Sequence, residues 1–224
     1  MFFDSTMLLL IPAVILSIYA QFKVKSAFAA MSKIRSTSGL TGAQAAKSLL
    51  QRNGINDVIV EEVPGSLTDH YDSRSKKLRL SSDVYHSTSL AALGVAAHET
   101  GHAIQHHTSY VPLNIRQSVF PVANIGSSLG IPLFFIGLIM SFKPLLDIGI
   151  IVFAGAVLFH IVTLPVEFNA SSRALAQLSN GGYLRSDEIS GARKVLNAAA
   201  LTYVAAAAMA VIQLLRLVML RGRD

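Results

Sequence analysis

The residues best suited to chemistry are His98, Glu99 and His102, which together form an H-E-x-x-H motif. The run of small and apolar residues from Leu90 to Ala97 predicts a helix that continues through the motif. On a helix, positions i and i+4 share one face, so the two imidazoles can bind one metal ion. Glu99 then lies near the ion without being a ligand, where a general base for a zinc-activated water is needed. The motif therefore predicts a Zn²⁺ site for hydrolysis.

A surface helix with two scattered histidines is the alternative interpretation of the motif, and its setting argues against it. The preceding residues predict a buried helix, where histidine and glutamate are costly unless they are paired or bound to metal. His106 and His107 follow one turn later, and His106 is i+4 from His102. His106 is therefore a candidate for a further ligand or a supporting group. We favour a polar helix end, where histidine suits the helix dipole.

The composition predicts a membrane protein. The chain has 224 residues, of which 52% are hydrophobic and 14% charged, and its mean hydropathy is +0.50. It contains no cysteine, which excludes disulfides, thiolate zinc ligands and a cysteine nucleophile. The net charge is +6, but the basic residues form no cluster with interleaved aromatics. We therefore expect the lipid bilayer, and no nucleic acid, as a partner.

Four segments are long and apolar enough to cross a bilayer, which takes about 20 residues. They are residues 6–22, 119–142, 145–164 and 198–220. Only Lys143 and Pro144 separate the second segment from the third, which predicts a tight helical hairpin. Arg216 lies within the fourth segment. That helix either crosses with its arginine reaching the membrane surface or lies partly in the interface.

The spans divide the chain into five regions, and the basic residues near the span ends predict their orientation. We expect an N-terminal anchor over 1–22, a cytoplasmic catalytic region over 23–118, a transmembrane hairpin over 119–165, a cytoplasmic segment with the third metal ligand over 166–197, and a C-terminal transmembrane or interfacial helix over 198–224. Lysine and arginine gather after the first span and between the third and fourth. The positive-inside rule then places the active site at the cytoplasmic face of the cell membrane. Arg221 and Arg223 disagree with this orientation if the last helix crosses.

The region 23–118 is the largest outside the spans and predicts a small α+β fold. Thr41 is a plausible N-cap for a helix over Gly42–Arg52, residues 58–63 and 76–81 are predicted strands, and residues 67–73 a polar turn. Zinc peptidases commonly hold an extended substrate at the edge of a sheet. Residues 76–81 are either that edge or an ordinary amphipathic strand. The expected fold class is thus a mainly α membrane protein, with about four transmembrane helices and a zincin-like metallopeptidase region.

A catalytic zinc site usually has three protein ligands and an open position, so the chain should supply one more histidine or carboxylate. Glu167 is our prediction, because it is the only acid between Asp147 and Asp187 and lies where the third span ends. A carboxylate that suits the first turn of a helix is the alternative interpretation. His160, inside the third span, is a further candidate, but as a ligand it would require a metal that lies deeper.

Several short segments follow a pattern known from one family of enzymes. They are Ala96–His106 around the motif, Asp69-His-Tyr-Asp72, Leu80-Ser81 and Glu167-Phe-Asn-Ala-Ser171. In these segments and in its span order the chain resembles the YugP family of membrane zinc metallopeptidases. More distantly it is similar to the HtpX and CAAX prenyl protease group, which has a cytoplasm-facing zinc site on membrane helices. The resemblance implies His98, His102 and Glu167 as zinc ligands and Glu99 as the catalytic residue. In the wider group, an aspartate that supports a zinc histidine follows the third ligand by four residues, and here Ser171 stands at that position.

We therefore expect a membrane-embedded, gluzincin-like zinc endopeptidase that hydrolyses peptide bonds at the cytoplasmic face. Its substrate would be a peptide or a membrane protein, and Glu99 would act as general base on the zinc-activated water. Arg173 is the predicted electrophile for the oxyanion, with Tyr183 as a second candidate. A positive anchor at the membrane surface is the alternative interpretation of Arg173.

Two other functions compete with this hypothesis. A non-enzymatic membrane scaffold would keep a structural zinc closed by four protein ligands, such as His106 in addition to the other three, but it would not need Glu99. A metal transporter would use His160 and Arg216 as pathway residues, but the centres of the spans contain no acids. An accessory membrane protein or a homo-oligomer is compatible with the main hypothesis as a further partner.

Overall fold

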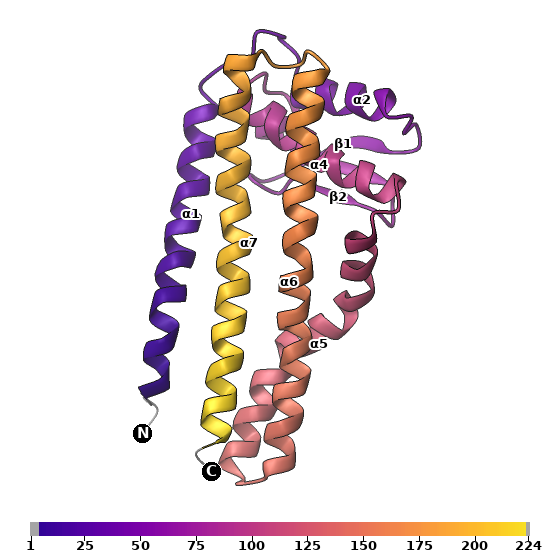
Figure 1. Cartoon of the computed structure of the whole chain (residues 1–224). Coiled ribbons are helices and arrows are strands. Elements are labelled where there is room, and N and C mark those ends of the chain that lie inside the picture. The colour runs from indigo at the N-terminus through magenta and orange to yellow at the C-terminus, as the bar shows by residue number, and fades with distance from the viewer. Residues whose placement is uncertain (1–4, 223–224) are drawn as a thin grey trace. The chain divides into compact units, whose positions relative to one another are not determined.

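The computed structural model describes residues 5–222, and helices make up most of this part of the chain (Figure 1). In chain order the elements are η1 (Ser5–Leu10), α1 (Ile11–Met31), α2 (Gly42–Arg52), β1 (Ile59–Val63), β2 (His70–Asp72), β3 (Lys77–Ser81), α3 (Ser82–Tyr85), α4 (Leu90–His107), α5 (Val111–Ile139), α6 (Lys143–Asn180) and α7 (Ser186–Arg221). Their contacts divide the chain into two compact units. The apolar unit comprises the residues up to Gln21, Val111–Pro165 and the residues from Leu201 onward, and the polar unit comprises Phe22–Tyr110 and Val166–Ala200.

Four helices within residues 5–222 are long and apolar enough to cross a membrane, as the sequence predicted. They are Ser5–Met31, α5, α6 and α7. Ser5–Met31, α6 and α7 extend beyond the predicted spans at both ends, because each apolar segment continues into helical residues of more polar character. α5 begins before residue 119 but ends at Ile139, three residues before the predicted end at 142. Lys143 and Pro144 are not the hairpin turn but the first residues of α6. Proline suits a first helical turn, where its missing N–H is not needed.

The core of the apolar unit is built by α5, α6 and α7. Phe134, Leu146 and Leu217 are among its fully buried side chains. Glycines let α5 and α6 approach closely, since a Cβ at Gly130 would lie 2.7 Å from the Cβ of Phe153.

Arg216 of α7 is buried in the apolar unit rather than extended to a membrane surface. It is 5% exposed, and its Nε donates to Thr6 Oγ1 at 3.2 Å. Near the end of the same helix, Arg221 Nε pairs with Asp147 Oδ1 at 2.9 Å. α7 is one continuous helix that includes Arg216 and ends at Arg221.

The polar unit contains a three-stranded sheet in the order β1-β3-β2. β1 pairs with β3 in parallel, with Ile59 opposite Lys77, and β2 pairs with β3 in antiparallel fashion, with Tyr71 opposite Leu78. The strand predicted over 76–81 is the central strand, so neither of its edges is open to a substrate, and of its two interpretations the ordinary amphipathic strand agrees with the structure. The prediction of a polar turn over 67–73 was wrong in part, because this segment contains the edge strand β2. Leu78 and Leu80 are fully buried, which explains why β3 lies in the middle.

The helix that carries the motif is packed on two sides within the polar unit. Ala92 and Ala96 of α4 belong to a core cluster with the sheet residues Leu78 and Leu80, whereas Leu93 belongs to a second cluster with residues of α2, α6 and α7. At its start, Ser89 Oγ accepts from the Ala92 N–H at 3.2 Å. The predicted cap of α2 is also confirmed, because Thr41 and Gln44 form a capping box. Small residues thus allow α4 to be enclosed while its motif remains on one face.

Candidate metal centre

The candidate metal centre lies between α4 and the part of α6 that belongs to the polar unit. The ring centroids of His98 and His102 lie 4.8 Å apart with their planes at 85°, as expected for side chains one helical turn apart. Glu167 Oε2 lies 3.2 Å from His98 Nε2 and 3.5 Å from His102 Nε2. One potential ligand atom from each of these residues lies within 4.8 Å of the other two. The three residues predicted as ligands are therefore brought together.

The chemistry of this donor set fits zinc. Two imidazoles and a carboxylate, with no thiolate, are the ligands of a typical catalytic zinc site, which keeps a fourth position open. The Glu167 side chain is only 3% exposed and those of the histidines 12%, so an unpaired carboxylate here would be costly. Burial lowers the pKa of His102, but the hydrogen bond and the charge of Glu167 outweigh burial and raise it overall. Without a cation between them, the carboxylate and this imidazole would therefore pair with each other.

Gly101, inside the motif, allows the two helices to meet. A Cβ at this position would lie 2.6 Å from the carbonyl oxygen of Ala170 on α6. Such a distance is shorter than a van der Waals contact, and the obstacle is backbone that cannot rotate away. The absent side chain thus lets α6 bring Glu167 to the histidines.

Both zinc-ligand candidates on α4 have a partner for their second ring nitrogen. Ser171 Oγ lies 3.1 Å from His98 Nδ1, so serine occupies the supporting position that the wider group gives to aspartate. Gln105 Oε1 lies 3.0 Å from His102 Nδ1. Such partners orient metal ligands. The sequence analysis did not single out Gln105, although its i+3 spacing from His102 was a usable signal.

Glu99 is buried on the motif helix, with 8% of its surface exposed. It lies close enough to Asp69 for its charge to act on that carboxyl group. Burial raises the pKa of Asp69, hydrogen bonds from Ser81 oppose the rise, and the charge of Glu99 adds to it. Asp69 accepts from the Ser81 N–H at 2.8 Å. Two of the short segments that carry the family resemblance are thus joined next to the motif.

The two candidates for the oxyanion have other partners in the structure. Arg173 Nε donates to Asn169 Oδ1 at 2.7 Å, and its guanidinium carbon lies 5.8 Å from the ring centroid of Tyr110. The Tyr183 hydroxyl is bonded to Ser48 Oγ at 2.6 Å in a core cluster, and no contact links it to the metal ligands within the described chain.

The other candidate histidines, His106, His107 and His160, lie outside the group of potential ligands found in residues 5–222. His106 Nδ1 is bonded to the Tyr71 hydroxyl at 2.9 Å, and with His107 it lines a cavity of about 270 Å³. His160 belongs to the apolar unit. The interpretation of His106 as a fourth metal ligand is therefore not supported.

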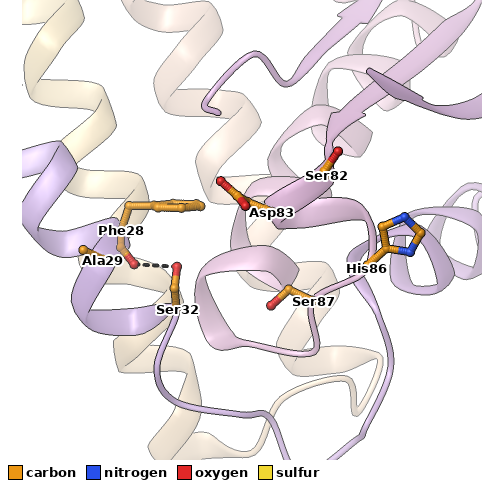
Figure 2. Close-up of a pocket in the computed structure, with 7 residues that line it drawn as sticks. All are labelled: Phe28, Ala29, Ser32, Ser82, Asp83, His86 and Ser87. Carbon is orange, nitrogen blue, oxygen red and sulfur yellow. Dashed lines mark hydrogen bonds between the residues drawn. The ribbon is translucent and has the colours of Figure 1, made fainter. Parts of the chain in front are cut away.

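A separate hollow of the polar unit lies beside the last turn of α1 and the helix α3 (Figure 2). It has a volume of about 530 Å³, and Phe28, Ser32, Asp83 and His86 are among its lining residues. None of the three candidate ligands lines it. This hollow is therefore distinct from the metal centre.

Comparison with known proteins agrees with the geometry of the centre. The family model described as "Putative neutral zinc metallopeptidase" matches residues 6–222. A curated relative from Bacillus subtilis (strain 168), named "Putative membrane protease YugP", is 50% identical over 218 residues, which cover 96% of this chain and 97% of the relative. No solved structure matches the chain. The predicted family and the predicted zinc cofactor are confirmed.

Proposed function

The chain belongs to the neutral zinc metallopeptidase family, and from this premise we propose that it is a membrane-embedded zinc endopeptidase of the gluzincin type. The observation that carries the proposal is the convergence of three ligands, two histidines and a glutamate, around a buried position beside Glu99. Three ligands leave a position open for a reacting water, whereas a structural zinc site is closed by four. This favours an enzyme over a scaffold.

His98, His102 and Glu167 would hold the metal, and Glu99 would move the proton. When bound, zinc supplies a Lewis acid that lowers the pKa of water and polarises a carbonyl group. Glu99 follows His98 directly and is not one of the three ligands, so its carboxylate can accept a proton from water at the open position. It can then deliver this proton to the amine that leaves when the peptide bond breaks. Both transfers require a carboxylate, and an amide cannot perform them.

Arg173 is our proposed electrophile for the oxyanion. In the described part of the chain only its Nε is hydrogen-bonded, so the two terminal nitrogens keep their donors. A fixed cation near a developing negative charge stabilises the transition state without reorganisation. The bond to Asn169 would hold the guanidinium in place for this role.

We place the centre at the cytoplasmic face of the cell membrane, where peptides or membrane proteins would be the substrates. The support is the excess of lysine and arginine in the segments after the first span and between the third and fourth. Four membrane-capable helices, and a relative that is named as a membrane protease, agree with an embedded enzyme.

The variant Glu99→Gln tests the proposal, because it removes the base and keeps all three ligands. We expect zinc content equal to that of the wild type and at least a hundredfold slower cleavage of a membrane-protein substrate in detergent, which is the lower end of general-base effects of about 10²–10⁴. Glu62→Gln is the matched control, since Glu62 lies in the same unit, is exposed and contacts Ser82. Undiminished cleavage by a zinc-loaded Glu99→Gln protein would refute the mechanism.

A further inference from the structure

Gln105 is a buried amide that is hydrogen-bonded at both ends. No part of its surface is exposed. Its Oε1 lies 3.0 Å from Nδ1 of His102. Its Nε2 donates to the carbonyl oxygen of Val166 at 2.8 Å and to Asn169 Oδ1 at 3.0 Å. One side chain of α4 therefore connects a metal-ligand candidate to the turn of α6 that carries Glu167.

The orientation of the Gln105 amide is determined by its partners. A backbone carbonyl can only accept a hydrogen bond, so the atom that faces Val166 must be the NH₂ group. Asn169 is determined in the same way, because Arg173 Nε can only donate and lies 2.7 Å from Asn169 Oδ1. Both ends of this chain of hydrogen bonds thus require Oε1 of Gln105 to face His102.

The protonation of the His102 ring follows from this orientation. Oε1 can only accept, so Nδ1 of His102 must carry the proton. In the neutral ring, which is the form that binds a metal, Nε2 then carries the lone pair, and it faces Glu167 at 3.5 Å. His98 differs, because its partner is the Ser171 hydroxyl, which can donate or accept. The partner of Nδ1 therefore determines the tautomer of His102 but not that of His98.

We propose that Gln105 is a positioning residue that holds His102 in its metal-binding tautomer, with Asn169 and Arg173 holding Gln105. The proposal rests on the proposed function, since it treats His102 as a zinc ligand. Through its hydrogen bond to Asn169, Arg173 would also help to position Gln105 before the reaction starts, in addition to its proposed role in the reaction.

Zinc affinity, measured by chelator competition on the full chain in detergent, tests this role. Gln105→Met keeps the volume and the burial but removes both ends of the amide, and we expect zinc to bind 10–100-fold more weakly, as is typical when a ligand's supporting partner is lost. Gln177→Met is the matched control, because Gln177 is also a glutamine of the polar unit, on α6, and its Nε2 donates to Asn53 Oδ1 at 3.0 Å. It should lower thermal stability without changing zinc affinity.

Asn169 provides a second test that does not alter Gln105. Only its Oδ1 is hydrogen-bonded in the described residues, so Asn169→Asp keeps both bonds whereas Asn169→Leu breaks them. We expect zinc affinity within threefold of the wild type for the aspartate variant and a loss of about tenfold for the leucine variant. Equal losses in the two variants would show that packing alone matters.

The outcomes separate this inference from the proposed function. Zinc affinity of Gln105→Met within threefold of the wild type would overturn the inference and leave the peptidase proposal standing. If Gln105→Met binds zinc more weakly but the wild type cleaves no peptide, the inference is supported and the proposed function is refuted. Failure of the wild type to bind zinc would overturn both.

Discussion

At the scale of single residues, the metal centre depends on a carboxylate from a distant part of the chain. Glu167 is 69 positions from His98, with its Oε2 3.2 Å from the ring nitrogen. We expect Glu167→Gln to lose most of its bound zinc, because a neutral amide is a much weaker ligand for Zn²⁺ than a carboxylate. Metal content after dialysis measures this.

The control for that variant is Glu188→Gln, since Glu188 is also a buried glutamate of the polar unit. Its carboxylate accepts from the Thr37 N–H at 2.7 Å and from the Arg185 N–H at 2.8 Å. Its replacement should lower the melting temperature and leave the zinc content unchanged. Full zinc content in Glu167→Gln would contradict the ligand assignment.

Asp72 makes the stability of the polar unit depend on pH. Hydrogen bonds from the Ser75 hydroxyl and the Arg74 N–H lower its pKa from 3.8 to about 2. Because the pKa of Asp72 is lower in the folded protein than in the unfolded chain, its carboxylate stabilises the fold fully above pH 3.8. This contribution to the free energy of unfolding is lost as the pH falls through about 2. We expect Asp72→Asn to lose less stability than the wild type between pH 4 and pH 2, as measured by urea unfolding in detergent. Asp83→Asn, which alters an exposed acid, should follow the wild type.

His98, Glu99 and His102 could be predicted from the sequence, because metal binding on a helix imposes a fixed spacing on this motif. Glu167 was found because an isolated acid at the end of an apolar span is costly without a partner. Gln105 and Asn169 were not found, since amides are common and their roles depend on which helices meet. The positions of Arg173 and Tyr183 could not be predicted for the same reason.

At the scale of elements, the contact between α4 and α6 depends on Gly101. We expect Gly101→Ala to destabilise the protein by about 1–3 kcal/mol, because overpacking against the Ala170 carbonyl outweighs the better helix propensity of alanine. Thermal unfolding with and without zinc measures this change. Gly191→Ala is the matched control, since its nearest obstacles are Leu90 Cδ1 and Met31 Sδ, the flexible ends of side chains. Equal effects of the two substitutions would show that the close approach is unimportant.

The helices could be predicted better than the sheet. Apolar length and a capping residue are local signals, which is why the membrane-capable helices and the cap at Thr41 were found. The order of strands is not local. β2 has only three residues, too few for a visible alternation, and its pairing with β3 makes β3 the central strand. The parallel pairing of β1 with β3 likewise depends on contacts that no single segment contains.

At the scale of the whole molecule, the orientation in the membrane can be tested without background labelling, because the chain contains no cysteine. We expect Ser141→Cys, in the hairpin turn, to react with an impermeant maleimide in intact cells, and Ser66→Cys to react only after lysis. Gly222→Cys decides whether α7 crosses, and we expect it to be labelled from outside. Labelling of Ser66→Cys in intact cells would reverse the proposed orientation.

The buried arginine of the apolar unit has a consequence for how the protein is made. Arg216 and its partner Thr6 are 210 positions apart in the sequence. At a synthesis rate of roughly 5–20 residues per second, the first helix is made about 10–40 seconds before the last one can reach it. Throughout this interval the surface around Thr6 lacks a guanidinium that it contacts in the finished protein. Because the ribosome adds that guanidinium 210 residues after Thr6, the apolar unit cannot reach its final packing until Arg216 of α7 has been made.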